Sequence, residues 1–247
     1  MSWIKAFCIV LFLYCLQSNA QEITIYTIGD STMSNKKNPD KNPEHGWAQV
    51  LSQFFTAEVQ IDNRAVNGRS TKSFIAEGRW DSIVTQLQPG DYVFIQFGHN
   101  DQKFKDPDRF TNPYTAYRTN LVRFVAETRA QGAHPILFTS IVRRNFNEFG
   151  VLIDTHGEYP LVVRMVANEL KVPLIDLQTL TEAWEISYGV EASKQLHLHF
   201  KSGEHPYYPN GKEDNTHLSK KGATAIAKMV VEVIEQQQID LKKYIKP

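Results

Sequence analysis

Short runs of apolar, β-branched and aromatic residues alternate along this chain with longer segments in which apolar residues recur every three to four positions. The short runs are typical of buried strands, and the longer segments are typical of helices that bury one face. Strands that alternate with helices form a parallel sheet covered by helices on both faces. The pattern therefore predicts one α/β domain with five strands, at residues 23–28, 58–65, 92–97, 136–139 and 173–175.

Helical spacing is clearest near the C-terminus, where a helix is expected to begin after Ser219, a suitable N-cap. Similar spacing places Trp47 and Trp184 on apolar helix faces, and it predicts that Met165 points inward from another helix. Residues 187–216 follow neither period, so we expect this segment to be mostly irregular.

The N-terminal residues differ in pattern from the rest of the chain. Lys5 precedes an apolar stretch at 6–16 that is too short to span a bilayer, and small residues follow at 18–20. This order is typical of a secretory signal peptide. We therefore expect residues 1–20 to be removed and residues 21–247 to form a single domain that is secreted or periplasmic.

Both cysteines, Cys8 and Cys15, lie inside the predicted signal peptide, so residues 21–247 contain none. A domain of this length has a core large enough to be stable without disulfides. A lipoprotein anchor at Cys15 is an alternative, although Tyr14 is bulkier than the small residue that such a site needs.

The charge of the chain argues against nucleic acids and membrane surfaces as partners. Its 27 basic and 27 acidic residues give a formal net charge of zero, and no long run of one sign is present. A nucleic-acid groove or a membrane-surface patch normally needs such a run. We expect no nucleic-acid partner and no stable membrane insertion after the signal peptide is removed.

Small and polar residues directly follow three of the predicted strands. Ser31 follows the first strand in Gly-Asp-Ser, Gly68 follows the second in Asn-Gly, and Asn100 follows the third in Gly-His-Asn-Asp. The carboxyl ends of parallel strands meet at one edge of a sheet, where ligands bind. Asp214 and His217 stand three positions apart, just before the last helix. We expect these five residues to form one site.

These residue types fit nucleophilic acyl transfer. A serine hydroxyl needs a base to take its proton, and His217 is the candidate base for Ser31. Asp214 is near enough in sequence to hold the other imidazole nitrogen and to stabilise the imidazolium. The oxyanion also needs preorganised donors, for which the backbone N–H groups of Ser31 and Gly68 and the Asn100 amide are candidates.

Residues beside these motifs are candidates for supporting roles. Asp30 and Asp101 are expected to brace their loops. Arginine binds carboxylates with paired hydrogen bonds, and aromatic loop residues stack on sugar rings. For each such residue the alternative is a solvated or locally packed side chain. The candidate substrate contacts are His99, Arg143, Arg144, Tyr207 and Tyr208.

Three histidines near the C-terminus, His197, His199 and His205, raise the alternative of a metal site. A His-x-His pair can chelate zinc, but no carboxylate or cysteine stands at a familiar spacing from it. We favour histidines that face solvent or contact substrate, and we expect neither a metal nor another cofactor.

Taken in order, these blocks resemble those of the SGNH hydrolases, also called GDSL-type hydrolases. Each block alone is weak, but four in order across nearly all of residues 21–247 are specific. The resemblance implies a three-layer α/β/α sandwich with a flavodoxin-like, five-stranded parallel sheet. It also implies a triad of Ser31, Asp214 and His217, with Ser31, Gly68 and Asn100 as oxyanion donors. The Gly-x-Ser-x-Gly turn of the α/β-hydrolases does not fit, because Met33 occupies the place of its second glycine.

Longer stretches, at 29–32, 67–70 and 212–219, resemble the rhamnogalacturonan acetylesterases of carbohydrate esterase family 12. This resemblance implies a metal-independent serine esterase that removes acetyl groups from the pectin backbone through an acetyl-enzyme. The chain lacks the disulfide framework of the fungal members and is more similar to the bacterial ones. The alternatives are an SGNH esterase for another acetylated glycan such as xylan, a short-chain lipase or esterase, and a carbohydrate-binding protein without activity.

Overall fold

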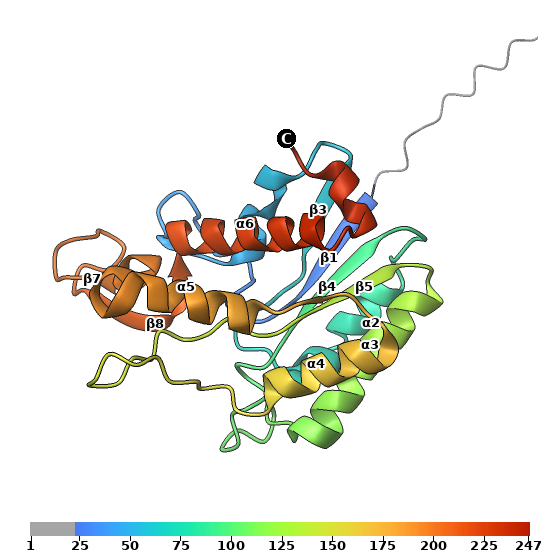
Figure 1. Cartoon of the computed structure of the whole chain (residues 1–247), viewed down its shortest axis with the longest axis horizontal. Coiled ribbons are helices and arrows are strands. Elements are labelled where there is room, and N and C mark those ends of the chain that lie inside the picture. Colours follow the sequence, from blue (N-terminus) through green and yellow to red (C-terminus); the bar gives the residue numbers. More distant parts are fainter. Residues whose placement is uncertain (1–22) are drawn as a thin grey trace, which may run out of the picture.

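The computed structural model describes residues 23–247, and the predicted signal peptide lies outside that range. Its centre is a sheet of five parallel strands in the order β3-β1-β4-β5-β6 (Figure 1). The five-stranded parallel sheet predicted from the sequence is therefore confirmed. The strands are β1 (Ile23–Gly29), β3 (Val59–Asn63), β4 (Tyr92–Gln96), β5 (His134–Phe138) and β6 (Leu174–Ile175).

Apolar side chains form two cores, one on each face of this sheet. β4 is buried along its whole length, with Phe94 in one core and Val93 and Ile95 in the other. Successive residues of a strand point to opposite faces, so a strand covered on both sides is apolar at nearly every position. Each fully buried side chain of this kind stabilises the fold by roughly 1.5–3 kcal/mol.

Helices cover both faces, as Figure 1 shows with α6 on one side of the sheet and α3 and α4 on the other. α6 begins as predicted, because the Ser219 hydroxyl accepts a hydrogen bond from the Gly222 N–H. The first core packs against η1 (Trp47–Phe54), α5 (Leu177–Ala192), α6 (Lys220–Gln236) and η4 (Asp240–Tyr244). The second packs against α1 (Thr71–Ala76), α2 (Arg79–Val84), η2 (Pro113–Tyr117), α3 (Arg118–Ala130) and α4 (Tyr159–Leu170).

A second, antiparallel sheet consists of β2 (Glu44–His45), β8 (Lys212–Ser219) and β7 (His197–Phe200), in that order. The expectation that residues 187–216 are mostly irregular is therefore wrong. α5 continues to Ala192, η3 (Ser193–Leu196) follows, and two strands come after it. Leu218 is the one apolar residue of β8, and a loop at 201–211 joins this strand to β7, so no hydrophobic period in the sequence predicts the pair.

Two further expectations about packing need correction. Met165 is 38% exposed on α4, whose buried face carries Val162, Val163 and Val166 instead. Trp47 lies in the core as predicted, but it starts a 3-10 helix and not an α-helix. Trp184 is partly buried and packs against the first core.

The register of β1 and β4 decides where the site forms. Gly29, the last residue of β1, pairs with Gln96, the last residue of β4, so both strands end at the same edge. A Cβ at Gly29 would lie 2.6 Å from the Gln96 carbonyl oxygen, which only glycine avoids. The chain can therefore turn directly into Asp30 and Ser31. Within residues 23–247, no helix has the length and apolar character needed to cross a membrane.

Candidate active site

Ser31 and His217 meet at the edge where the parallel strands end. The turn after β1 presents Ser31, and β8 carries Asp214 and His217. His217 Nε2 lies 2.9 Å from Ser31 Oγ, and His217 Nδ1 lies 2.8 Å from Asp214 Oδ2. The three side chains thus form one continuous hydrogen-bonded chain, the arrangement in which a base activates a serine.

The Asp214 carboxylate is held in place by backbone donors as well as by the imidazole. Its Oδ1 accepts hydrogen bonds from the N–H groups of Thr216 and His217, both at 2.9 Å. Partial burial raises the pKa of Asp214, but the His217 ring and these N–H groups outweigh it and hold the pKa well below its usual range. Asp214 therefore stays ionised beside His217 and favours the imidazolium.

The three predicted oxyanion donors lie in adjoining loops. Among the described residues, the backbone N–H groups of Ser31 and Gly68 donate no hydrogen bond. Gly68 has φ of 77°, a conformation that favours glycine. The Asn100 Nδ2 donates to the Arg69 carbonyl at 3.2 Å, and the Asn100 Oδ1 accepts from Arg109 Nη1 at 3.3 Å. The Asn100 amide is thereby fixed beside Gly68, and its second N–H is free for a ligand.

Asp30 supports the turn that carries Ser31. Its Oδ1 accepts from both the N–H and the hydroxyl of Thr32 at 2.9 Å, and its Oδ2 lies 3.3 Å from His99 Nδ1. Burial raises the pKa of Asp30, but the charge and hydrogen bonding of His99 and the Thr32 donors outweigh it and lower the pKa to about 2. Burial lowers the pKa of His99 to about 4, so its ring is neutral near pH 7.

The His99 ring is 3% exposed and stacks edge-on against the His156 ring, with centroids 4.6 Å apart. His99 contacts Asp30 and also lines a surface hollow together with Arg143, so its contact with substrate stays a prediction.

Asp101 joins the loop after β4 to the start of α1. Its Oδ1 accepts from the hydroxyls of Thr71 and Thr111 at 2.5 Å and 2.8 Å. Complete burial raises the pKa of Asp101 to about 7, against the lowering effect of these donors. The carboxyl thus ties two loops of the site together, the bracing role expected of it.

Lys36 is a site residue that the sequence did not single out. Its side chain is 3% exposed, and its Nζ lies 2.6 Å from the Ser31 carbonyl oxygen and 2.9 Å from Asn67 Oδ1. It also forms a 2.8 Å ion pair with Glu44. One ammonium therefore connects the turn that carries Ser31 to the loop that carries Gly68. In the sequence Lys36 stands in a polar loop beside Lys37, and nothing local distinguishes the two.

The two predicted substrate-binding arginines differ in their surroundings. Arg143 donates to Thr155 Oγ1 at 2.8 Å and to the His99 carbonyl at 3.4 Å, and it lines a surface hollow. Arg144 is 7% exposed, and its guanidinium donates to Ser193 Oγ at 2.9 Å and Asn215 Oδ1 at 3.0 Å, and also to the Val190 carbonyl. Arg144 therefore holds α5 and β8 together.

The two predicted tyrosines are likewise unequal. Tyr207 is 40% exposed and lines a hollow together with Lys36 and Asn67. Tyr208 packs against the Phe200 ring, with the Lys212 ammonium 5.9 Å from its ring centre. Burial, followed by nearby acidic groups, raises the pKa of Tyr208 to about 12. Only Tyr207 offers a free face near the site.

The three C-terminal histidines do not converge. His197 is buried and its Nε2 lies 2.6 Å from Glu185 Oε1, so the expectation that it faces solvent or substrate is wrong. His199 Nε2 lies 2.8 Å from Asn215 Oδ1, and His205 Nδ1 accepts from the Tyr207 N–H at 3.1 Å. Within residues 23–247, no three histidine, cysteine or acidic side chains are grouped to hold a metal ion.

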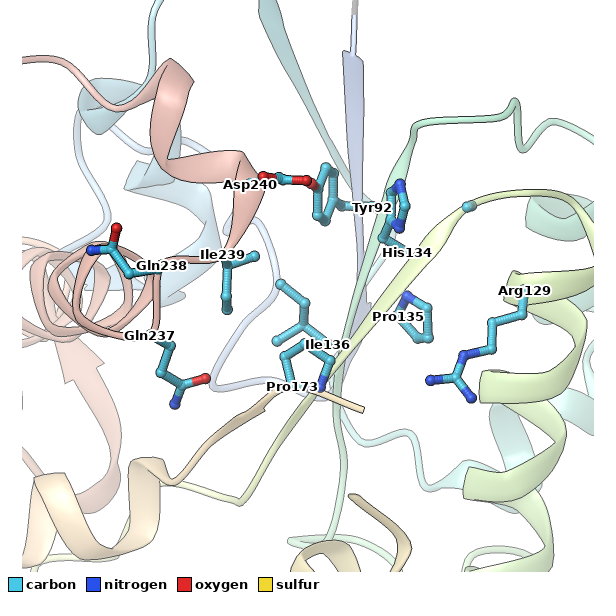
Figure 2. A pocket seen from close by; sticks show the side chains of 11 residues that line it. Tyr92, Arg129, His134, Pro135, Ile136, Pro173, Gln237, Gln238, Ile239 and Asp240 are labelled. Atoms are coloured by element: carbon cyan, nitrogen blue, oxygen red, sulfur yellow. The ribbon is translucent and has the colours of Figure 1, made fainter. Parts of the chain in front are cut away.

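A hollow of about 430 Å³ lies at the opposite edge of the sheet (Figure 2). It is lined by Tyr92 and His134, the first residues of β4 and β5, and by Asp240. Figure 2 shows the Tyr92 and His134 rings side by side, and their centroids are 5.0 Å apart. This hollow is remote from the carboxyl ends of the strands, where Ser31 and its partners meet.

Sequence similarity to known proteins points to the same chemistry as the geometry of the site. Residues 27–225 match the GDSL-like Lipase/Acylhydrolase family. The chain belongs to this family. It is 45% identical to the rhamnogalacturonan acetylesterase RhgT of Bacillus subtilis, over 90% of this chain and 94% of that protein. It is 28% identical to the rhamnogalacturonan acetylesterase of Emericella nidulans, over 83% of this chain and 81% of that one.

Solved structures share the fold. The Bacillus subtilis protein YxiM superposes with a TM-score of 0.74 and 28% identity, over 89% of this chain and 58% of that one. An acetylxylan esterase, Axe2 of Geobacillus stearothermophilus, has a TM-score of 0.61 and 18% identity, over 86% of this chain and 94% of that one, which shows the fold alone. The predictions of an SGNH-type α/β sandwich and of a carboxylic-ester hydrolase are confirmed.

Proposed function

We propose that this GDSL-family member is a serine esterase that removes O-acetyl groups from rhamnogalacturonan, a pectic polysaccharide. The observation that carries the chemistry is the continuous chain from Asp214 through His217 to Ser31, with both links at 2.9 Å or less. The likeness to two rhamnogalacturonan acetylesterases supports the choice of polymer. We further propose that residues 1–20 are a secretion signal and that residues 21–247 form the esterase domain, which suits a substrate outside the cell.

In the first half of the proposed reaction, Ser31 Oγ attacks the acetyl carbonyl carbon while His217 Nε2 takes the hydroxyl proton. Asp214 stabilises the resulting imidazolium through its 2.8 Å contact with Nδ1. The N–H groups of Ser31 and Gly68 and the Asn100 amide donate hydrogen bonds to the former carbonyl oxygen and stabilise its negative charge. The carbon–oxygen bond to the sugar then breaks, and His217 returns the proton to the sugar oxygen.

In the second half, a water molecule attacks the acetyl-enzyme from the side that the sugar has left. His217 takes a proton from this water, the tetrahedral intermediate forms in the same oxyanion site, and Ser31 Oγ leaves as it regains the proton. Acetate is released and the starting state is restored. Every proton transfer in this cycle passes through His217 Nε2, which lies within hydrogen-bond distance of Ser31 Oγ.

The surroundings of Ser31 favour a polar substrate with a short acyl group. One neighbouring hollow is lined by Ser34, Asn35, Lys36 and Asn67, with Tyr207 as its aromatic member. A lipase needs an extended apolar surface for its acyl chain, whereas polar side chains and a single aromatic face suit a sugar. We therefore place substrate recognition in the polar loops around the strand ends.

The test is acetate release from acetylated rhamnogalacturonan and from acetylated xylan by the wild type and by Ser31→Ala. We expect rapid release from rhamnogalacturonan, slower release from xylan, and loss of both in Ser31→Ala. Equal release by the two proteins would refute the mechanism, and faster release from xylan would refute the substrate. Comparison of 4-nitrophenyl acetate with 4-nitrophenyl octanoate decides acyl length, and preference for octanoate would point to the lipase alternative.

A further inference from the structure

A second surface hollow next to the candidate active site gathers positive charge. It measures about 370 Å³, within the range of small-ligand sites, and its charged lining is Lys103, Lys105, Arg109 and Arg143 against one carboxylate, Asp106. We call this the cationic hollow. The chain as a whole has no net charge, so this concentration of one sign is local.

Most of these charges have no acidic partner. Asp106 pairs with Arg109, at 2.5 Å from its Nη2. Among the described residues, Lys103, Lys105 and Arg143 form no ion pair with a carboxylate. Partial burial, followed by the charges of Arg109 and Arg143, lowers the pKa of Lys103. The cations therefore repel one another in the free protein, and an anion bound among them would relieve that repulsion.

The cationic hollow adjoins the oxyanion donors. Arg109 Nη1 donates to Asn100 Oδ1 at 3.3 Å and lies 3.8 Å from the position of a Cβ on Gly68. Arg143 Nη2 donates to the carbonyl of His99, the residue before Asn100. A polymer whose ester reaches Ser31 would therefore place a neighbouring part of its chain over the hollow.

An exposed ring completes this site. Phe104 lines the cationic hollow between the two lysines in sequence and is 72% exposed. A large aromatic side chain so exposed in a polar loop offers a flat face on which a pyranose ring can stack. The surrounding cations can bind a negatively charged substituent of that ring.

We propose that the cationic hollow binds the carboxylate of a uronate residue of the polymer, and that it selects acidic over neutral acetylated glycans. This inference rests on the proposed function for its link to catalysis, but the binding itself does not require turnover. Arg109 and Arg143 provide forked donors at the inner side, and Lys103 and Lys105 provide point charges at the rim.

The test is isothermal titration calorimetry with an oligogalacturonate that carries no acetyl group, and with its fully methyl-esterified form. The proteins are the wild type, the double variant Lys103→Gln/Lys105→Gln, and a control double variant, Lys228→Gln/Lys243→Gln, which loses the same charge on α6 and η4. We expect the wild type to prefer the acid form and the test variant to bind it about tenfold more weakly than the control. The difference should shrink at high salt.

Absence of binding, equal affinity for the two ligands, or equal losses in both double variants would overturn the inference. Acetate release by the wild type separates it from the proposed function. If the enzyme cleaves 4-nitrophenyl acetate but releases no acetate from rhamnogalacturonan, the proposed substrate fails, and the calorimetry still decides whether the hollow binds uronate.

Discussion

The ammonium of Lys36 lies 2.6 Å from the carbonyl oxygen of Ser31, the residue whose hydroxyl lies 2.9 Å from His217 Nε2. The same ammonium reaches Asn67 Oδ1, next to Gly68. A buried cation with several acceptors fixes their relative positions, because every acceptor is drawn to one point. Lys36 therefore fixes the turn that carries Ser31, the proposed nucleophile, relative to the loop that carries Gly68, a proposed oxyanion donor.

Lys36→Met should lower kcat by about 100-fold with little change in KM, because small misplacements of reacting groups have effects of that size. It should also lower the free energy of unfolding by about 1–3 kcal/mol, because buried acceptors lose their donor. The measurements are 4-nitrophenyl acetate kinetics and urea unfolding. Lys37→Met, at the exposed neighbouring position, is the matched control, and similar kcat values in the two variants would refute the positioning role.

Asp214→Asn should lower kcat by about 10⁴-fold, because the carboxylate that accepts a hydrogen bond from His217 Nδ1–H is replaced by an amide that can donate one instead. The amide would favour the imidazole tautomer that cannot take the Ser31 proton. Glu213→Gln makes the same chemical change at an exposed neighbouring position and should retain the wild-type kcat. A loss of similar size in both variants would mean that the strand β8, and not the triad, had been disturbed.

Asn100→Ala should lower kcat by about 10²–10³-fold, because one oxyanion donor is lost. Asn100→Asp keeps the shape of the side chain but lacks its N–H groups, and it places a negative charge near the developing oxyanion. We expect it to be at least as impaired as Asn100→Ala. If Asn100→Asp retained most of the activity, the side chain would act by filling space and not by donating a hydrogen bond.

His99 should make the folded protein less stable as the pH falls from 6.5 towards 4. Its folded pKa of about 4 lies below the ordinary value of 6.5, so the unfolded chain binds the proton first in that window. Asp101, with its pKa raised to about 7, contributes with the opposite sign between about pH 4 and 7. The His99 contribution is therefore obtained as the difference between the wild type and His99→Gln.

The measurement is the free energy of unfolding in urea at steps from pH 4 to pH 7. We expect the advantage of the wild type over His99→Gln to grow as the pH rises through this window. His134→Gln, an exposed histidine at the far edge of the sheet, controls for loss of an imidazole. A constant difference between wild type and His99→Gln across the range would rule out a buried neutral His99.

The sequence was sufficient to predict that Ser31, Gly68 and Asn100 stand in loops at one edge of the sheet. Each follows a strand of a parallel sheet, and the ends of parallel strands share one edge whatever the packing details. β4 is apolar at nearly every position because both its faces are covered, so the periodicity also predicted its place inside the sheet. Asp214 and His217 followed from the chemistry that a serine nucleophile requires.

The tertiary structure decided what lies behind and around that site. β2 pairs with β8 although the two strands stand near opposite ends of the chain, and the mostly polar residues of β8 show no period that predicts it. Lys36 differs from Lys37 only in which acceptors surround it, and Arg144 differs from Arg143 only in being enclosed by α5 and β8. Burial and long-range hydrogen bonds are properties of the folded surroundings, so the local sequence does not contain them.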